Sequence, residues 1–266
     1  MKIDYKETPS DLLARINIHE KFGARNIDDW MIETVPLKEG MHILDVGCGA
    51  GKQCFSYFDT LHGNAQIVGG DVSEELLAKA KEENRRRGTD IVFTELDFNK
   101  PFAFDDDSFD LASCSFAIYY AENIPFTIKE MHRVLKPGGY LFTTGPMPEN
   151  KKTFYDIIKE ATNKVIPPMP GSSRYSTEIL DAVKALFAHT DLIIFENPLT
   201  FDEAEPFLVY TRASLSEDRK LWSSFFEGQD EFESVMHKIK AVTEKRIQKD
   251  GKIVMTKVVG GILAKK

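Results

Sequence analysis

The chain has 266 residues, of which 42% are hydrophobic, and a formal net charge of −8. This length and composition fit one α/β domain with additions, large enough to bury a full core. The basic residues are dispersed, and their tightest cluster, Arg85 to Arg87, stands at the end of an expected helix, where cations suit the helix dipole. An acidic chain without a basic face argues against nucleic acids and anionic membranes as partners.

We expect neither a membrane-spanning segment nor a metal site. No apolar run reaches the roughly 20 residues that cross a bilayer, and the first ten residues lack an apolar signal-peptide core. The three cysteines, Cys48, Cys54 and Cys114, are an odd number without metal-ligand spacing. These features predict reduced thiols in a cytoplasmic protein that does not insert into membranes.

Helical periodicity begins near the N-terminus, over Ser10 to Glu33, with an interruption near Gly23. The next segment, Met41 to Lys52, reads as a buried strand, a turn with a glycine at every second position from Gly47 to Gly51, and a helix start. Glycine can take positive φ and has no Cβ, so backbone here can approach a small ligand closely. The helix that follows offers unpaired N–H groups to an anionic part of that ligand.

Strands and helices then alternate, as in a parallel sheet with helical crossovers. The expected strands cover residues 43–46, 67–71, 91–96, 109–116, 140–144, 192–196 and 252–263. The expected helices cover residues 52–60, 74–87, 123–135, 151–165 and about 177–187, with a rigid loop at 167–171. Residues 199–250 are expected to add two or three helical stretches that are rich in aromatic side chains.

Two of the expected strands end in a carboxylate, at Asp71 and at Asp97. The carboxyl ends of parallel strands meet at one edge of a sheet, where such folds bind their ligands. Asp71 follows Gly51 by 20 residues, a spacing that suits a carboxylate on both hydroxyls of a ribose. The alternative for Asp71 is capping of the next helix, beside Ser73.

Taken together, these segments resemble the class I S-adenosylmethionine-dependent methyltransferases, in the small-molecule group related to ubiquinone-biosynthesis methyltransferases. The segments that carry the resemblance are Leu44 to Gly51, Asp71, Leu96 to Phe98, Phe109 to Leu111 and Val134 to Gly139. The glycines follow an acidic residue as G-x-G-x-G, whereas a dinucleotide fingerprint has G-x-G-x-x-G, and this spacing favours adenosylmethionine over NAD.

The resemblance implies a Rossmann-like α/β fold. Its sheet is expected to have seven strands, mostly parallel with the last one antiparallel, with helices on both faces and a helical cover. We expect a single methyltransferase domain over residues 1–266. Its parts are N-terminal cap helices (1–36), a cofactor-binding core (37–145), the helical cover (146–176 and 199–250) and the remaining core (177–198 and 251–266).

The resemblance also assigns residues to S-adenosylmethionine, whose product would be S-adenosylhomocysteine. Gly47 and Gly49 are assigned to its methionine and ribose portion through their backbone, and Asp71 to the ribose hydroxyls. Asp45 is assigned to the methionine amino group, directly or through water, with holding of the turn as the alternative.

The adenine and the other end of the cofactor have their own assigned residues. Val72 is expected to pack on the adenine, Asp97 to accept from its amino group, and the Phe98 N–H to serve a ring nitrogen. The alternative for Asp97 is capping of its own loop. Ser115, at the end of the fourth strand, is assigned to the methionine amino group.

The acceptor side has weaker signals, because a sulfonium methyl is already activated and the protein mainly aligns the reactants and excludes water. Tyr119 and Tyr120 stand where relatives often have a histidine, and they are candidates to orient the acceptor or else packing residues of the cover. His19 in the N-terminal cap is the third catalytic candidate. Tyr210 and Arg212 in the cover are further candidates for substrate contact.

The expected function is methyl transfer to a small, partly apolar metabolite enclosed by the aromatic cover, although these aromatics would equally serve as the cover's own core. The chain has Ser113 to Phe116 where nucleobase methyltransferases carry Asn/Asp-Pro-Pro-Tyr, which argues against DNA bases as acceptors. Two alternatives stay open: a non-catalytic S-adenosylmethionine-binding protein, and another transferase with a related cofactor, such as an aminopropyl transferase.

Overall fold

The computed structural model describes residues 9–165, 170–217 and 229–266. These residues form a seven-stranded sheet in the order β3-β2-β1-β4-β5-β7-β6. The strands are β1 His42–Val46, β2 Gln66–Asp71, β3 Val92–Glu95, β4 Phe109–Ser115, β5 Leu135–Pro146, β6 His189–Phe201 and β7 Ile253–Lys265. Strands β1 to β5 are parallel, and β7 runs antiparallel to both of its neighbours. The predicted Rossmann-like sheet with an antiparallel last strand is therefore confirmed.

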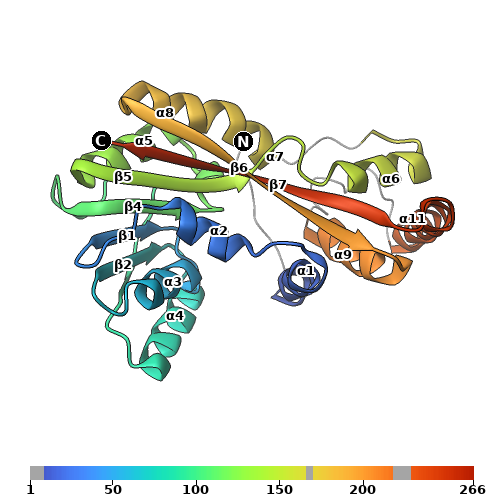
Figure 1. Cartoon of the computed structure of the whole chain (residues 1–266), viewed down its shortest axis with the longest axis horizontal. Coiled ribbons are helices and arrows are strands. Elements are labelled where there is room, and N and C mark those ends of the chain that lie inside the picture. The colour runs from blue at the N-terminus through green and yellow to red at the C-terminus, as the bar shows by residue number, and fades with distance from the viewer. Residues whose placement is uncertain (1–8, 166–169, 218–228) are drawn as a thin grey trace.

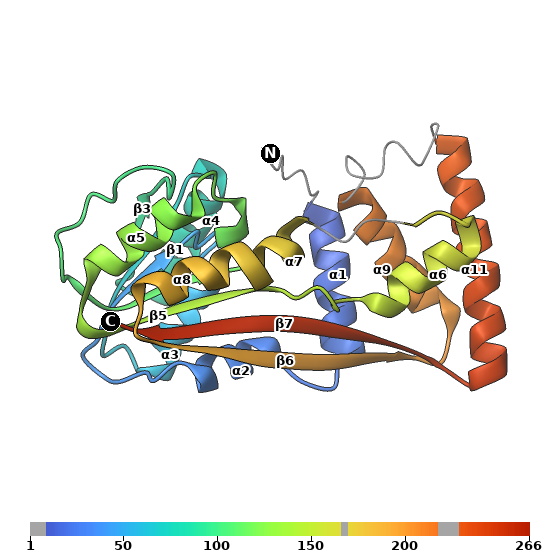
Figure 2. The ribbon, with the colours of Figure 1, turned by 90° about the horizontal axis from the view of Figure 1, so that it is seen from above.

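Helices cover both faces of this sheet (Figures 1 and 2). One face carries α2 Ile27–Thr34, α3 Lys52–Thr60 and α4 Glu74–Arg87, and the other carries α5 Ile124–Val134 and α8 Leu180–Leu186. Helix α4 has the caps that its sequence predicts. The Ser73 hydroxyl accepts a hydrogen bond from the Leu76 N–H at 3.3 Å, and Gly88 ends the helix with φ 69°.

Several other helices of the described residues gather beyond the carboxyl end of β5, as Figures 1 and 2 show. This helical lobe consists of α1 Pro9–Phe22, α6 Lys152–Thr162, α9 Ala204–Glu217 and α11 Gln229–Asp250. Strands β6 and β7 pair over their full length and extend into the lobe. Four of the aromatic side chains that the sequence assigned to the cover, Phe201, Phe207, Tyr210 and Phe232, are buried in the lobe's own core. Trp222, Phe225 and Phe226 lie outside the described residues.

Three predicted boundaries were wrong. The fifth strand was expected at 140–144 but runs from Leu135 to Pro146, because Leu135 pairs with Phe109 of β4 and Pro146 pairs with Val259 of β7. The sixth strand was expected at 192–196 but runs from His189 to Phe201, because the equally long β7 pairs with all of it. The helix expected from about 177 begins at Pro170, with α7 Pro170–Arg174 continuing through residues 175–179 into α8. Proline suits the first helical position because its missing N–H would have no partner there. Residues 167–169 of the expected loop lie outside the described residues.

Residues 175–179, which join α7 to α8, are held against the sheet by Tyr175, whose side chain is fully buried. Its Oη donates to the Thr143 carbonyl at 2.6 Å and accepts from the Ile262 N–H at 3.2 Å. The ring fits only because Gly145 and Gly260 lie beneath it, since a Cβ at either position would come within 3 Å of ring atoms. This contact holds α7 beside the carboxyl end of β4, where the candidate site lies.

Candidate functional site

The glycine-rich turn after β1 folds tightly against β2. The N–H groups of Gly47 and Cys48 both donate to the Gly70 carbonyl, at 2.7 and 3.0 Å. Gly47 has φ 71°, and a Cβ on it would come within 2.6 Å of the Ala117 Cβ. A side chain at this position would therefore meet both an unfavourable backbone conformation and a clash, so this glycine is required by the turn itself.

Asp71 braces the same turn from the end of β2. One carboxylate oxygen accepts from the Gly49 N–H at 2.8 Å, and the other accepts from the Ser73 N–H at 2.9 Å. The cap of α4 is the Ser73 hydroxyl, so Asp71 holds the residue before the helix and does not cap the helix itself. Each oxygen still has a lone pair that is not used by these two bonds, so the carboxylate keeps the capacity to accept hydrogen bonds from a ligand.

Asp45 points into the protein and not toward the open edge of the sheet. Its carboxylate is 2% exposed and accepts hydrogen bonds from the Ser113 hydroxyl at 2.6 Å and the Cys54 thiol at 3.5 Å. Burial raises its pKa to about 6, although these two hydrogen bonds act in the opposite direction and the charge of Asp71 adds to the rise. This geometry favours the alternative in which Asp45 holds the turn in shape.

Val72 and Asp97 lie on the loops that follow β2 and β3. Val72 is 57% exposed, so its side chain is available to a ligand. Asp97 accepts from the Asn99 N–H at 2.9 Å and pairs with Lys100 at 3.2 Å. Partial burial would raise the pKa of Asp97, but these contacts outweigh it and lower the pKa. Phe98, the next residue, is half-buried against the core on the α5 side.

The end of β4 contributes a buried hydroxyl and a strained residue. The Oγ of Ser115 is buried and makes no hydrogen bond within the described part of the chain. Phe116, which the sequence analysis did not assign, has φ 56° and is 36% exposed. A bulky residue in this conformation is strained, and such strain gathers at functional sites. No signal in the sequence marks it, because its backbone conformation depends on the bond from its N–H to the Thr144 carbonyl.

Tyr119 and Tyr120 follow in a short 3-10 turn over residues 118–120. Their rings lie 4.6 Å apart, and the Tyr119 carbonyl accepts from Arg174 of α7 at 2.8 Å. Tyr119 is 8% exposed and belongs to the core on the α5 side, with Tyr120 packed against it. The structure thus places both tyrosines just past the carboxyl end of β4, packed in the core on the α5 side and not in the helical cover that the alternative named.

His19 lies on α1 in the helical lobe, away from this turn. Its ring meets that of Tyr210 edge-on at 5.6 Å. Burial and then the charges of Lys257, Lys151 and Arg15 lower its pKa to about 2. An imidazole with such a pKa is neutral at physiological pH and a weak base, so His19 is poorly suited to accept a proton from a substrate.

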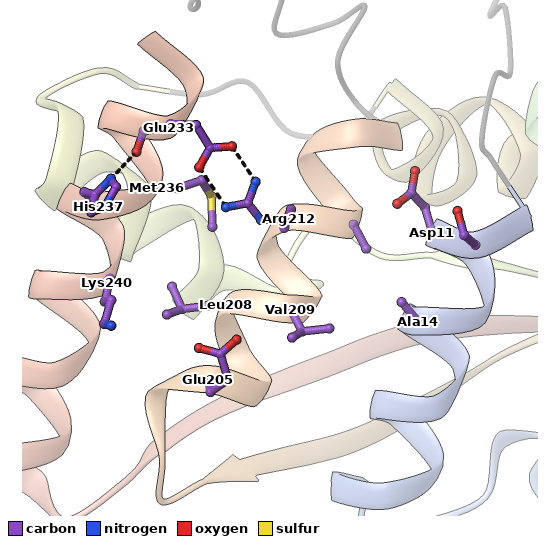
Figure 3. A pocket seen from close by; sticks show the side chains of 12 residues that line it. Asp11, Ala14, Glu205, Leu208, Val209, Arg212, Glu233, Met236, His237 and Lys240 are labelled. Atoms are coloured by element: carbon purple, nitrogen blue, oxygen red, sulfur yellow. Dashed lines mark hydrogen bonds and ion pairs between the residues drawn. The ribbon is translucent and has the colours of Figure 1, made fainter. Parts of the chain in front are cut away.

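A separate pocket of about 480 Å³ opens between α1, α9 and α11 (Figure 3). Arg212 lines it and forms two bonds to the Glu233 carboxylate, at 2.7 and 2.9 Å. Tyr210, two residues earlier on α9, faces the lobe's core instead. None of the described lining residues is among those assigned to the cofactor, so this pocket is distinct from the predicted site.

Two kinds of feature are absent from residues 9–165, 170–217 and 229–266. No group of three or more histidine, cysteine, aspartate or glutamate side chains among them could hold a metal ion. Within the same residues, no helix is both long and apolar enough to cross a bilayer.

Comparison with known proteins points to one family. A family model described as "Methyltransferase domain" matches residues 37–204. A demethylmenaquinone methyltransferase of Chlorobaculum tepidum is 36% identical over 143 residues, which cover 52% of this chain and 54% of that protein. A nocamycin O-methyltransferase of Saccharothrix syringae is 29% identical over 118 residues, covering 44% and 42%. The matched part of the chain thus spans about half the length of either relative.

A solved structure shares the fold. The YcgJ protein from Bacillus subtilis superposes with a TM-score of 0.57 at 17% identity, covering 90% of this chain and 97% of that one. The family model spans more than half of the present chain and includes the glycine turn, Asp71 and Asp97. The chain therefore belongs to the methyltransferase-domain family.

Proposed function

We propose that this protein is an S-adenosylmethionine-dependent methyltransferase that acts on a small metabolite, and that residues 1–266 work as a single domain. The observation that carries the proposal is the glycine turn braced by Asp71 at the carboxyl edge of the sheet. This is the edge at which open α/β folds bind their ligands. Family membership and the demethylmenaquinone and nocamycin methyltransferases among its relatives support the same reaction class.

The residues at this edge fit such a cofactor. Asp71 is proposed to accept from the ribose hydroxyls, and the backbone of Gly47 and Gly49 is proposed to lie along the ribose and methionine portion. The exposed Val72 offers an apolar surface for the adenine. The buried Ser115 hydroxyl lacks a partner in the described chain, and a buried hydroxyl of this kind is stabilised when a ligand supplies one.

The adenine edge and the turn complete the proposed binding set. Asp97 is proposed to accept from the adenine amino group and the Phe98 N–H to serve a ring nitrogen. Asp45 supports the cofactor indirectly in this proposal, because its hydrogen bonds to Ser113 and Cys54 hold the strand beneath the turn.

When bound, S-adenosylmethionine supplies an electrophilic methyl group on a sulfonium. The chain's own contribution is alignment of the acceptor and exclusion of water. Tyr119 and Tyr120 are the proposed orienting residues, since they lie just past β4 beside the strained Phe116. His19 is proposed to act as a neutral contact and not as a base, because its pKa is lowered to about 2.

The proposal is tested by incubating the protein with methyl-labelled S-adenosylmethionine and a metabolite extract. Label that appears in a small-molecule product supports it, and chromatography of that product identifies the acceptor. The matched control is the Asp71→Ala variant, in which labelling should fall strongly. Tight donor binding without label transfer would instead support the alternative of a non-catalytic binding protein. Label recovered in 5′-methylthioadenosine, the by-product that keeps the methyl group when the propyl chain of the donor is transferred, would support the other alternative.

A further inference from the structure

Phe116, just past the end of β4, combines a left-handed backbone with an exposed aromatic side chain. Its φ is 56°, a region that glycine enters freely and a bulky residue enters only at a cost in free energy. Full burial of the ring would offset that cost, but Phe116 is 36% exposed, whereas Cys114 and Ile118 on either side are completely buried. Packing within the described chain therefore does not account for a phenylalanine at this position.

Backbone hydrogen bonds on both sides impose this conformation. The Phe116 N–H donates to the Thr144 carbonyl of β5 at 3.0 Å, and the Tyr120 N–H donates to the Ala117 carbonyl at 2.9 Å. The chain enters and leaves position 116 along fixed directions, so the cost of placing a bulky residue there persists in the folded protein. Residues held in such backbone conformations cluster at sites of function.

The neighbours of Phe116 in the sequence both lie at the proposed donor site. Ser115 has a buried hydroxyl without a partner in the described chain, and it is proposed to contact the methionine amino group. Ala117 lies against the glycine turn, because a Cβ on Gly47 would come within 2.6 Å of the Ala117 Cβ. Strands β1 and β4 are paired neighbours, so the turn after one and the residues after the other share an edge of the sheet. Phe116 thus lies beside the place proposed for the methionine and ribose portion of the donor.

The atom that joins these two portions of S-adenosylmethionine is the sulfonium sulfur, which carries a permanent positive charge. The face of an aromatic ring carries partial negative charge and attracts a cation within about 6 Å of the ring centre. S-adenosylhomocysteine has a neutral thioether at the same point. A ring beside this atom therefore stabilises the donor, and its attraction is lost when the methyl group has left.

We propose that the Phe116 ring lies against the sulfonium of bound S-adenosylmethionine and distinguishes the donor from S-adenosylhomocysteine by charge. The inference rests on the proposed function, because it assumes that the donor binds at this edge with its methionine portion beside Ser115. It gives a ligand contact to a residue that the family resemblance did not assign. It also gives a reason for a bulky side chain at a position where glycine would cost less.

The test compares the Kd values of S-adenosylmethionine and S-adenosylhomocysteine, measured by calorimetry on the full chain without an acceptor. The ratio of the two is the readout, because contacts that both ligands share cancel in it. Phe116→Leu removes the aromatic face and keeps an apolar side chain. We expect the Kd of S-adenosylmethionine to rise roughly three- to thirtyfold relative to that of S-adenosylhomocysteine, the scale of one cation–π contact.

Two further replacements at this position separate charge from shape. A ring-trifluorinated phenylalanine keeps the size of the ring but weakens the negative charge on its face, so it should shift the ratio in the same direction as leucine. Phe116→Tyr keeps the aromatic face and should retain the ratio of the wild type. Phe58→Leu is the matched control, because Phe58 is a half-buried phenylalanine of α3 outside the proposed site, and both affinities should stay unchanged.

The inference is overturned if Phe116→Leu weakens both ligands equally, or if the trifluorinated protein keeps the ratio of the wild type. If Phe116→Leu does not fold, the trifluorinated protein decides, since its ring has nearly the original shape. Failure of the inference is distinguishable from failure of the proposed function. Protein that binds both ligands with a ratio independent of position 116 contradicts only the role of Phe116, whereas protein that binds neither ligand contradicts the proposed function and this inference with it.

Discussion

Replacement of Asp71 by alanine separates the two things that this carboxylate is placed to do. In the protein without ligand it accepts from the N–H groups of Gly49 and Ser73, at 2.8 and 2.9 Å. Asp71→Ala leaves both donors without that acceptor, and because the site is only half-buried, water replaces part of what is lost. We expect the free energy of unfolding to fall by about 1–3 kcal/mol.

Asp71→Ala should also lower the affinity for the ligand. Loss of a charged hydrogen bond to ribose hydroxyls costs roughly 1.5–3 kcal/mol, which raises the Kd about 10- to 150-fold. Isothermal titration with S-adenosylhomocysteine measures this, and urea unfolding measures the stability. The Kd of Asp71→Asn should lie between those of the wild type and Asp71→Ala, because the amide keeps one acceptor oxygen but has no charge.

Asp110→Ala is the matched control for this experiment. Asp110 also accepts from a backbone N–H, that of His42 at 2.8 Å, and it pairs with Lys136. It lies at the amino end of β4, whereas the proposed site lies at the carboxyl ends of the strands. We expect this variant to lose stability without losing affinity for S-adenosylhomocysteine. If Asp71→Ala binds S-adenosylhomocysteine within about twofold of the wild type, the assignment of Asp71 to the ribose is wrong and its role is confined to the turn.

Three further predictions follow from the same region. Folding raises the pKa of Asp45 from 3.8 to about 6, so the folded protein binds a proton more tightly than the unfolded chain does. The free energy of unfolding of the wild type should therefore fall as the pH rises from about 4 to above 6. Relative to Asp45→Asn, which does not titrate, we expect a fall of roughly 3 kcal/mol. Urea titrations at several pH values measure this difference, and parallel curves for the two proteins would contradict it. Ser115→Ala should leave the free energy of unfolding unchanged or slightly raised, because the buried hydroxyl has no partner in the described chain. The same variant should bind S-adenosylhomocysteine more weakly, by about 0.5–1.5 kcal/mol. Equal affinity of the variant and the wild type would show that Ser115 does not contact the ligand. Gly47→Ala should destabilise the fold by more than Gly40→Ala. Both glycines have a positive φ, but only at Gly47 would an added Cβ meet a neighbour, because nothing lies within 4 Å of the Cβ position at Gly40. We expect the free energy of unfolding to fall by about 1 kcal/mol for Gly40→Ala and by roughly 2–4 kcal/mol for Gly47→Ala. Thermal unfolding compares the two, and similar losses would show that the contact with Ala117 adds nothing.

The elements that the sequence predicted correctly depend on local patterns. Ser73 and Gly88 mark the ends of α4 because capping and left-handed backbone are properties of a few neighbouring residues. The positions of the glycine turn and of the carboxylates after β2 and β3 could likewise be predicted, because the carboxyl ends of the strands lie at one edge of any parallel sheet. The fold class followed from the alternation of apolar periodicities along the chain.

Only the tertiary structure decided what surrounds each side chain. The sequence places Asp45 beside a glycine turn, but its hydrogen bond to Ser113, 68 residues away, and the burial that raises its pKa arise from strand pairing. The same holds for His19 and Tyr210, whose rings come from α1 and α9 and lie 5.6 Å apart. Desolvation and charge depend on contacts across the fold, whereas periodicity and capping depend on adjacent residues. For this reason the sequence by itself indicated the edge of the sheet at which we propose that the donor binds. The surroundings of the proposed acceptor residues depend on tertiary packing and could not be predicted from the sequence.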